Sequence, residues 1–425
     1  MTTLIIIIFV LGYLTIAFEH TIRINKAASA ILTGVLCWSV YAIFSPDKQH
    51  VPTVLTEHLG EVAGILFFLL GAMTIVELID AHDGFQLIIS RIQTTNTRKL
   101  VWLIALIAFF LSAVLDNLTT TIVMVSLLRK IISDKNEKWM LAGLVVIAAN
   151  AGGAWSPIGD VTTTMLWIGG QITAVNIILK SFLPSLVCLL IPTAIIAAQL
   201  KGKNAPPVTE EKNSILTTTA RQRRTVFWVG ISSLLFVPVF KTLTHLPPYM
   251  GILFGLGVMW VITEIIHSGK DEEEKGLLSV NHALRKIDTP SILFFLGILL
   301  SIAALQTTGI LSNLATSMDH AIGNINVITI IIGLLSAVVD NVPLVAAAQG
   351  MYGLEQYPTD HYFWEFLAYC AGTGGSCLII GSAAGVAAMG MEKIDFIWYL
   401  KKIAWLALIG YLAGAAVFIL QENLF

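Results

Sequence analysis

Two acidic residues lie in the middle of long apolar stretches, and each is followed by an asparagine. Asp116 and Asn117 lie within residues 99–132, and Asp340 and Asn341 lie within residues 325–353. A carboxylate in the hydrocarbon of a membrane is costly, so such a residue usually belongs to an ion or proton pathway. Asp and Asn also favour ordinary turns, and a surface turn between two short helices is the alternative interpretation.

A third acidic residue, Asp160, follows a stretch that glycine and proline interrupt. Gly152, Gly153, Pro157 and Gly159 weaken a helix, because glycine loosens the backbone and proline removes a hydrogen-bond donor. The interruption frees backbone carbonyls near four oxygen-bearing side chains, those of Asn150, Ser156, Asp160 and Thr163. Hard cations such as Na⁺ bind oxygen ligands of this kind, including the carbonyls of broken helices. The stretch therefore predicts a cation site.

A second glycine-rich stretch, residues 369–390, carries hydroxyls instead of an acid. Its polar candidates are Thr373, Ser376 and Ser382, and Ser382 occupies the position that matches Asp160. Small residues also allow helices to pack closely in lipid, so Ser382 has a packing alternative. The two halves of the chain would then contribute unequally, with two carboxylates from the first half and one from the second.

Three further polar residues lie in or beside apolar segments. Glu77 is either a proton relay or a structural hydrogen-bond partner. Glu264 lies near the inner end of its segment, where its side chain can reach the membrane interface. His82 is a candidate pH sensor, although an interfacial position is favoured.

The composition defines the environment in which these side chains must work. Of the 425 residues, 56% are hydrophobic and 12% are charged, which is about half the charged fraction of a soluble domain. This excludes a soluble enzyme and a nucleic-acid binder, and apolar runs of about 20 residues predict an all-α polytopic membrane protein. The four cysteines lie in apolar segments, so we expect neither disulfides nor zinc. Nucleotide-binding and metalloprotease motifs are missing from the sequence, so we expect no enzyme activity and no cofactor.

Internal similarity predicts two structural repeats. SAVLDN at 112–117 matches SAVVDN at 336–341, and AGGAWSPIGD at 151–160 aligns without a gap to TGGSCLIIGS at 373–382. Matched blocks in the same order indicate repetition. We expect repeat one to cover 1–199, with a hairpin at 99–132 and a broken helix at 141–169. A cytoplasmic linker would cover 200–224. Repeat two would cover 225–425, with a hairpin at 325–353 and a broken helix at 363–391.

Positive charges predict the orientation. If both termini lie outside, 22 of the 25 lysines and arginines fall in inner loops, as the positive-inside rule requires. Each of the two hairpin segments must then enter and leave the membrane by the same face. Two full crossings need about 40 residues, which is more than either segment has. We therefore expect re-entrant hairpins with the Asp-Asn pairs at their tips. Each repeat then has five crossings, so the two repeats have inverted topology. Transporters with this architecture bind their substrates near the midplane.

These motifs resemble those of the ion transporter superfamily, which contains divalent-anion/Na⁺ symporters and arsenite carriers. More specifically, the chain resembles the bacterial NhaD-type Na⁺(Li⁺)/H⁺ antiporters. Four stretches carry this resemblance, at residues 112–117, 152–167, 336–341 and 372–390. The resemblance implies a homodimer in a bacterial cytoplasmic membrane, with an elevator-like movement of the hairpin-bearing part. Dicarboxylate members carry Ser-Asn-Thr at the hairpin tips. This chain has Asp116-Asn117-Leu118-Thr119 and Asp340-Asn341-Val342-Pro343, and the added negative charge disfavours an anionic substrate.

We therefore expect exchange of Na⁺, and also Li⁺, for H⁺. Asp116, Asp160 and Asp340 would bind either a proton or the alkali cation, and this competition would couple the two movements. The neutral oxygens would come from Asn117, Asn150, Ser156, Thr163, Asn341, Thr373, Ser376 and Ser382. The alternatives are a Na⁺-coupled dicarboxylate symporter, an arsenite efflux carrier, and a structural or sensory membrane protein. An anion carrier should provide a compensating cation, and we expect no buried Lys or Arg beside these carboxylates.

Overall fold

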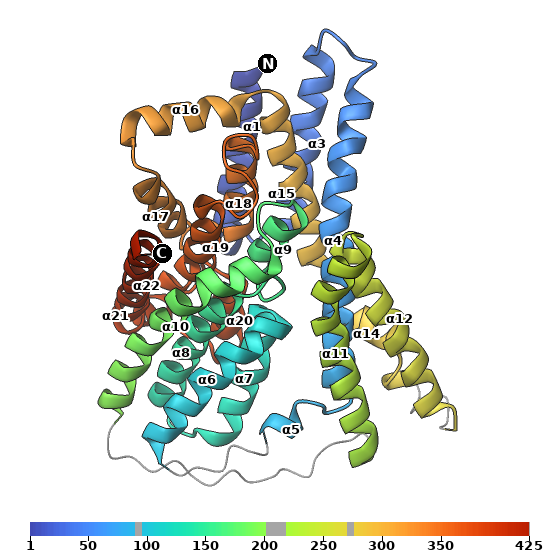
Figure 1. Ribbon diagram of the computed structural model, residues 1–425, viewed down its shortest axis with the longest axis vertical. Helices are drawn as coiled ribbons and strands as arrows, with labels where there is room; N and C mark the ends of the chain where they lie inside the picture. The colour runs from blue at the N-terminus through green and yellow to red at the C-terminus, as the bar shows by residue number, and fades with distance from the viewer. Residues whose placement is uncertain (90–95, 201–217, 270–275, 425) are drawn as a thin grey trace.

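The computed structural model describes residues 1–89, 96–200, 218–269 and 276–424 (Figure 1). Every regular element within these ranges is a helix, as the sequence predicts. Eight described helices are long and apolar enough to cross a membrane. The number rises to nine if α16 (Ile310–Ile322) and α17 (Ile325–Leu335), which meet at an angle of 118°, form one span. The protein is an all-α polytopic membrane protein.

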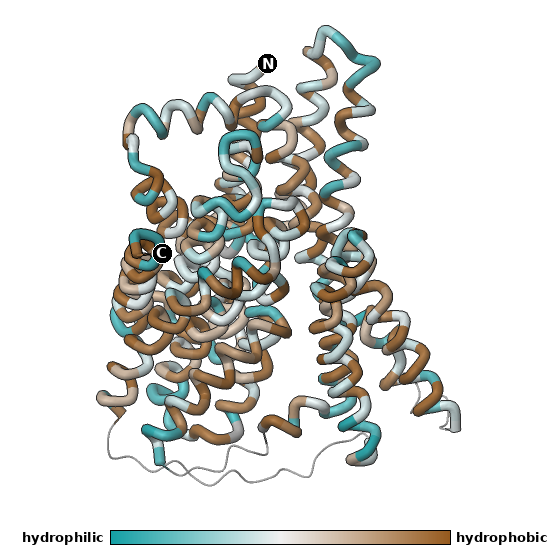
Figure 2. Tube along the Cα trace, in the orientation of Figure 1, coloured by the Kyte–Doolittle hydropathy of each residue, from teal (hydrophilic) through white to brown (hydrophobic). Residues whose placement is uncertain are grey.

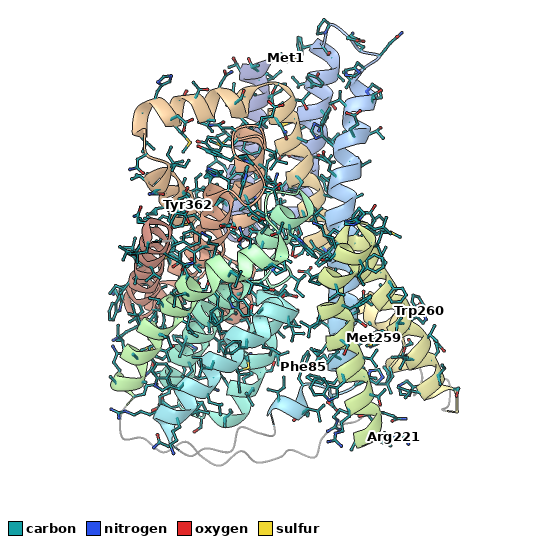
Figure 3. All side chains as sticks on the ribbon, in the orientation of Figure 1. Met1, Phe85, Arg221, Met259, Trp260 and Tyr362 are labelled. Atoms are coloured by element: carbon teal, nitrogen blue, oxygen red, sulfur yellow. The ribbon has the colours of Figure 1, made fainter. Side chains whose placement is uncertain are left out.

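The outer surface of the helices is apolar, as a lipid-facing surface must be. Leu179 on α10 (Ala174–Gln199) and Leu243 on α11 (Ala220–Thr244) are 67% and 72% exposed. On α12 (Pro248–His267) the neighbours Met259 and Trp260 differ, since Met259 is buried and Trp260 is exposed (Figure 3). Hydrophobic residues follow the length of α11 and α12, and hydrophilic residues gather at helix ends (Figure 2). The four cysteines are all buried.

One group of helices, which we call the frame, packs around α4 and α15. It contains α1 (Thr2–Ala17), α3 (Lys26–Phe44), α4 (Val51–Ala81), α11, α12 and α15 (Thr289–Thr307). The helix α3 lies along α15 and α1, while α4 contacts α11, α12 and α15. The Trp38 indole nitrogen donates a hydrogen bond to the Leu300 carbonyl at 2.8 Å, which ties α3 to α15. The frame therefore joins helices from both halves of the sequence.

A second group, which we call the core, contains the predicted hairpins and broken helices. Its members are α6 (Thr97–Leu115), α7 (Asn117–Ile131), α8 (Lys135–Gly153), α9 (Val161–Ile168), α17, α18 (Asn341–Met351), α19 (Tyr362–Gly374) and α20 (Ala383–Glu392). The helix α8 contacts α6, α7, α19 and α20, and α9 contacts α18 and α19. The long helices α10 and α22 (Ala404–Leu424) pack against each other beside this group. The core thus brings together segments that are far apart in sequence.

Helical geometry ends at four places in the core. The breaks fall at Asp116, at 154–160, at 336–340 and at 375–382, where the last contains the short 3₁₀ turn Gly375–Cys377. Asp116 has a φ of 87°, a backbone conformation that L-residues rarely adopt, and strain of this kind is concentrated at functional sites. Each break lies within a segment in which the sequence predicts an interruption.

Equivalent positions in the two halves make equivalent backbone contacts. A Cβ on Gly152 would lie 2.1 Å from the Phe109 carbonyl oxygen, and a Cβ on Gly374 would lie 1.9 Å from the Gly333 carbonyl oxygen. The Ser112 hydroxyl donates to the Ala149 carbonyl at 2.6 Å, and the Ser336 hydroxyl donates to the Ala371 carbonyl at 3.2 Å. These contacts support the two-repeat hypothesis. The inverted relation of the repeats, the re-entrance of the hairpins and the orientation of the termini stay predictions.

Several elements differ from the predicted segments. The helix α4 has 31 residues, more than the roughly 20 that a single crossing needs. The helix α16 lies just before the predicted hairpin 325–353, in a part of the chain for which the sequence predicts no element. Four short helices lie outside the predicted hairpins and broken helices: α2 (Glu19–Ile22), α5 (Gln86–Ile89), α14 (Val280–Lys286) and α21 (Phe396–Lys402). Most of the predicted linker 200–224 lies outside the described residues.

The close approach at Gly152 gives a test of the core packing. Gly152→Ala should destabilise the fold by about 2 kcal/mol, because a backbone carbonyl must move to admit the methyl group. Gly257→Ala on α12 is the matched control, since its Cβ would meet no atom within 4 Å. Thermal unfolding in detergent measures both variants. Equal melting temperatures for Gly152→Ala and the unsubstituted protein would contradict the described packing.

Candidate functional site

All four breaks end in a residue whose side chain caps the next helix. Asp116 accepts a hydrogen bond from the Thr119 backbone N–H at 2.7 Å at the start of α7, and Asp160 accepts one from the Thr162 N–H at 2.8 Å at the start of α9. Asp340 caps α18 and Ser382 caps α20 in the same way. A helix N-terminus carries partial positive charge, so it stabilises a carboxylate placed there.

The Asp160 carboxylate connects the two breaks that carry the Asp-Asn pairs. Asn117 donates its side-chain N–H to Oδ2 of Asp160 at 2.5 Å, and Asn341 donates to Oδ1 at 3.3 Å. The Thr162 hydroxyl also donates to Oδ1, at 2.6 Å. Asp160 is 1% exposed, so these donors replace the water that a buried carboxylate loses. The buried charge of Asp160 therefore depends on donors from both of these breaks.

Asn150 extends this network to the fourth break. Its side-chain oxygen accepts a hydrogen bond from Asn117 at 3.0 Å. Its side-chain N–H groups donate to the hydroxyls of Ser376 and Ser382, each at 2.9 Å. Six of the predicted residues, Asn117, Asn150, Asp160, Asn341, Ser376 and Ser382, thus form one continuous hydrogen-bond network.

A cavity of about 80 Å³ lies beside this network. Its polar wall comes from the core and includes Asp116, Asn117, Asp160, Asp340 and Asn341. The frame helices α4, α11, α12 and α15 contribute mostly apolar side chains to the wall, and α3 contributes the charged Lys26. A space of this size holds several water molecules or a partly hydrated cation. Within the described ranges no three His, Cys, Asp or Glu side chains are close enough to hold one metal ion, so the three aspartates share the cavity wall without forming a single cluster.

Three predicted hydroxyls lie away from the cavity wall. Ser156 donates to the Ala113 carbonyl at 2.6 Å, Thr163 to the Asp160 carbonyl at 2.9 Å, and Thr373 to the Tyr369 carbonyl at 2.6 Å. All three hydroxyls are buried. In this conformation they hold the backbone at the broken helices rather than line the space for an ion.

The remaining candidates are also remote from this cavity. Glu77 forms an ion pair with Lys286 at 3.2 Å, and its proposed relay role stays a prediction. Glu264 is partly exposed near the C-terminal end of α12. His82 is fully buried at the C-terminal end of α4, where its Nε2 lies 2.8 Å from Nε2 of His267, and its interfacial depth in the membrane stays a prediction.

A lysine from outside the predicted hairpins and broken helices lies beside Asp340, and its side chain is partly exposed rather than buried. The Lys26 ammonium lies 3.8 Å from its Oδ2. Lys26 is the first residue of α3, and its sequence context gives no signal of this distant contact. Among the described residues, no Lys or Arg pairs with Asp116 or Asp160.

The sequence interpretation also missed Glu365, although a signal was present. This acid lies inside the predicted segment 363–391 and is 1% exposed in the first turn of α19. Its carboxylate accepts a hydrogen bond from Asn176 on α10. The contact joins the core to α10 and lies outside the cavity described above.

The network gives a test that needs no transport assay. Asn117→Ala should lower the free energy of unfolding by about 2 kcal/mol, because it removes a donor from a buried carboxylate. Asn313→Ala, on the exposed face of α16, is the control and should have little effect. Both are measured by thermal unfolding in sodium-free detergent solution. If the two variants were equally stable, Asn117 would not be supporting a buried charge.

Comparisons with known proteins agree with the predicted resemblance. Residues 4–372 match the CitMHS family, described as "Citrate transporter". The chain is 50% identical to "Sodium/proton antiporter 1" of Arabidopsis thaliana, over 98% of this chain and 72% of that protein. It is 48% identical to "Sodium/proton antiporter 2" of the same plant, over 98% and 99% of the two chains. The "Na(+)/H(+) antiporter NhaD" of Alkalimonas amylolytica is 30% identical over 99% and 91% of the two chains. The chain therefore belongs to the CitMHS family within the ion transporter superfamily, and within it to the NhaD type.

Proposed function

We propose that this protein exchanges Na⁺ for H⁺ across its membrane. The observation that carries the proposal is the buried Asp160 carboxylate, held by Asn117 and Asn341 from two separate helix breaks beside a cavity. Asp116 and Asp340 line the same cavity. The printed names of the relatives, sodium/proton antiporters from a plant and from bacteria, support the same function.

Competition for carboxylate oxygens accounts for the coupling. A carboxylate next to a small cavity binds either a proton or an alkali cation, and each bound form excludes the other. The amides of Asn117 and Asn341 now donate to Asp160. Rotation of either amide would replace its N–H with an oxygen, which is a ligand for Na⁺. The site therefore contains the groups that both bound states need.

The charges that line the cavity favour a cation as the substrate over citrate, which the printed description of the matched family names. A helix N-terminus is an effective anion site. Here the chain's own carboxylates occupy three such positions, at the starts of α7, α9 and α18. A tricarboxylate would therefore approach three acids with Lys26 as the neighbouring cation, and the repulsion among these like charges would oppose its binding.

The position of the cavity suggests how access alternates. Its wall combines residues of the core with residues of the frame, so movement of one group against the other would expose the site to opposite sides in turn. We further propose that the cation can be Li⁺, that the protein is a homodimer, and that both termini lie outside. The bacterial cytoplasmic membrane stays the proposed location.

Asp160→Asn tests the function directly. The variant should abolish Na⁺-driven proton movement in reconstituted liposomes, because the amide can still cap α9 but cannot exchange a proton for a cation. Asp395→Asn is the matched control, since Asp395 caps α21 at an exposed position through the same kind of contact. A pH-sensitive dye inside the liposomes reports the flux.

The added solute separates the alternatives. NaCl and LiCl should each drive proton movement, whereas KCl, citrate and arsenite should not. Full exchange by Asp160→Asn would contradict the assignment of Asp160. Transport of citrate or arsenite without Na⁺-driven proton movement would instead favour an anion carrier.

A further inference from the structure

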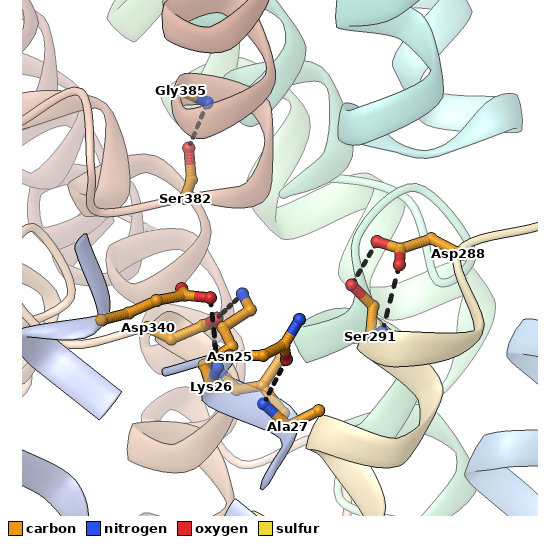
Figure 4. Close-up of polar contacts among 10 residues, drawn as sticks. Asn25, Lys26, Ala27, Asp288, Ser291, Asp340, Ser382 and Gly385 are labelled. Atoms are coloured by element: carbon orange, nitrogen blue, oxygen red, sulfur yellow. Dashed lines mark hydrogen bonds and ion pairs between the residues drawn. The ribbon is translucent and has the colours of Figure 1, made fainter. Parts of the chain in front are cut away.

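Lys26 lies between two cavities. It lines the cavity beside Asp160, and it also lines a second cavity of about 410 Å³ whose wall includes Glu19 and Asp288. Asp340 lines both cavities as well. Figure 4 shows the Lys26–Asp340 contact, with Asp288 and Ser291 at the start of α15 nearby. The ion pair therefore stands where an ion would pass from the acidic second cavity to the site.

The backbone of Lys26 is held in place on the frame. Asn25 caps α3 by accepting a hydrogen bond from the Ala27 N–H at 2.8 Å. The Lys26 N–H donates to the Glu19 carboxylate at 3.1 Å. The ammonium also lies 4.6 Å from the centre of the Phe294 ring on α15, a distance at which a cation is attracted to an aromatic face. Its side chain is 29% exposed, so water can reach it and the ammonium can leave the pair.

The contact joins the frame to the core. Lys26 is the first residue of α3, which packs on α15 and α1, whereas Asp340 ends the break before α18. Oδ2 of Asp340 faces the ammonium at 3.8 Å, and its Oδ1 accepts a weak hydrogen bond from the Val342 N–H at 3.4 Å. A metal cation that reached this carboxylate would meet a site already occupied by a positive charge.

We propose that Lys26 is a tethered counter-ion that Na⁺ must displace from Asp340. By competing with Na⁺, it lowers the apparent affinity for the ion. The pair also holds the core against the frame while no metal cation is bound there, and its rupture on Na⁺ entry frees the core to move. This inference rests on the proposed exchange of Na⁺ for H⁺.

Lys26→Met tests the proposal, because methionine keeps an unbranched stem beside Phe294 but has no charge. The apparent KM for Na⁺ in liposomes should fall by about fivefold, a change of the size expected for a partly exposed ion pair. Lys26→Arg should restore the value of the unsubstituted protein. Lys135→Met is the matched control: Lys135 is also the first residue of its helix and lies 4.5 Å from the Trp139 ring centre, away from the site.

The Asp340→Asn background separates competition from a structural role. If Lys26 acts through Asp340, Lys26→Met should leave unchanged the NaCl concentration that stabilises purified Asp340→Asn against heat. An unchanged or raised KM for Lys26→Met alone would overturn the proposal, and so would an equal fall in this stabilising NaCl concentration in the Asp340→Asn background. If Lys26→Met does not reach the membrane, Lys26→Gln is judged by the same criteria.

A binding measurement distinguishes failure of this inference from failure of the proposed function. Purified protein is titrated with NaCl against choline chloride, and its thermal stability in detergent is followed. Lys26→Met should be stabilised at about fivefold lower NaCl than the unsubstituted protein, even if no exchange is found in liposomes. Identical titration curves for the two proteins would overturn the role of Lys26, whereas absence of exchange by the unsubstituted protein would contradict the proposed function alone.

Discussion

The arrangement of the core depends on how one buried carboxylate is held. Asp160 is removed from water, and its oxygens are satisfied by amides from two different breaks and by the first turn of its own helix. A buried charge without such donors would be strongly destabilising. The breaks before Asn117 and Asn341 must therefore meet at this point. A change in the hydrogen bonds to Asp160 then acts on both breaks.

The two halves share a backbone arrangement but not the same chemistry. Close glycine contacts and serine-to-carbonyl hydrogen bonds occur at matched positions in both. At the capping position, however, Asp160 in the first half is matched by Ser382 in the second. Asn150, whose matched residue is Gly372, spans the difference by donating to Ser382. At this matched position only the first half supplies a carboxylate, although the backbone contacts nearby are alike in both halves.

Residue types and their local spacing were enough to locate the four helix breaks and most members of the hydrogen-bond network around Asp160. Asp116 and Asp340 stood out because an acid in an apolar stretch needs a reason, and the break before Asp160 followed from Gly and Pro. Composition and apolar run length were enough for the all-α membrane class. Ser156, Thr163 and Thr373 were correctly placed near the breaks, but sequence could not tell whether a hydroxyl turns to the cavity or to a nearby carbonyl.

Tertiary contacts between distant segments could not be read in this way. The Lys26–Asp340 pair joins residues over three hundred positions apart, and the His82–His267 pair joins two helix ends, so neither has a local pattern. Glu365 was different, because an acid within a predicted broken helix was visible in the sequence and was overlooked.

The central claim is that Na⁺ and H⁺ compete for the same carboxylates. The most direct measurement is proton release from purified protein in weakly buffered detergent solution when NaCl is added, with choline chloride as the reference. The account predicts that Na⁺ binding releases protons and that the release saturates with NaCl concentration. Binding of Na⁺ without proton release, or with proton uptake, would contradict it.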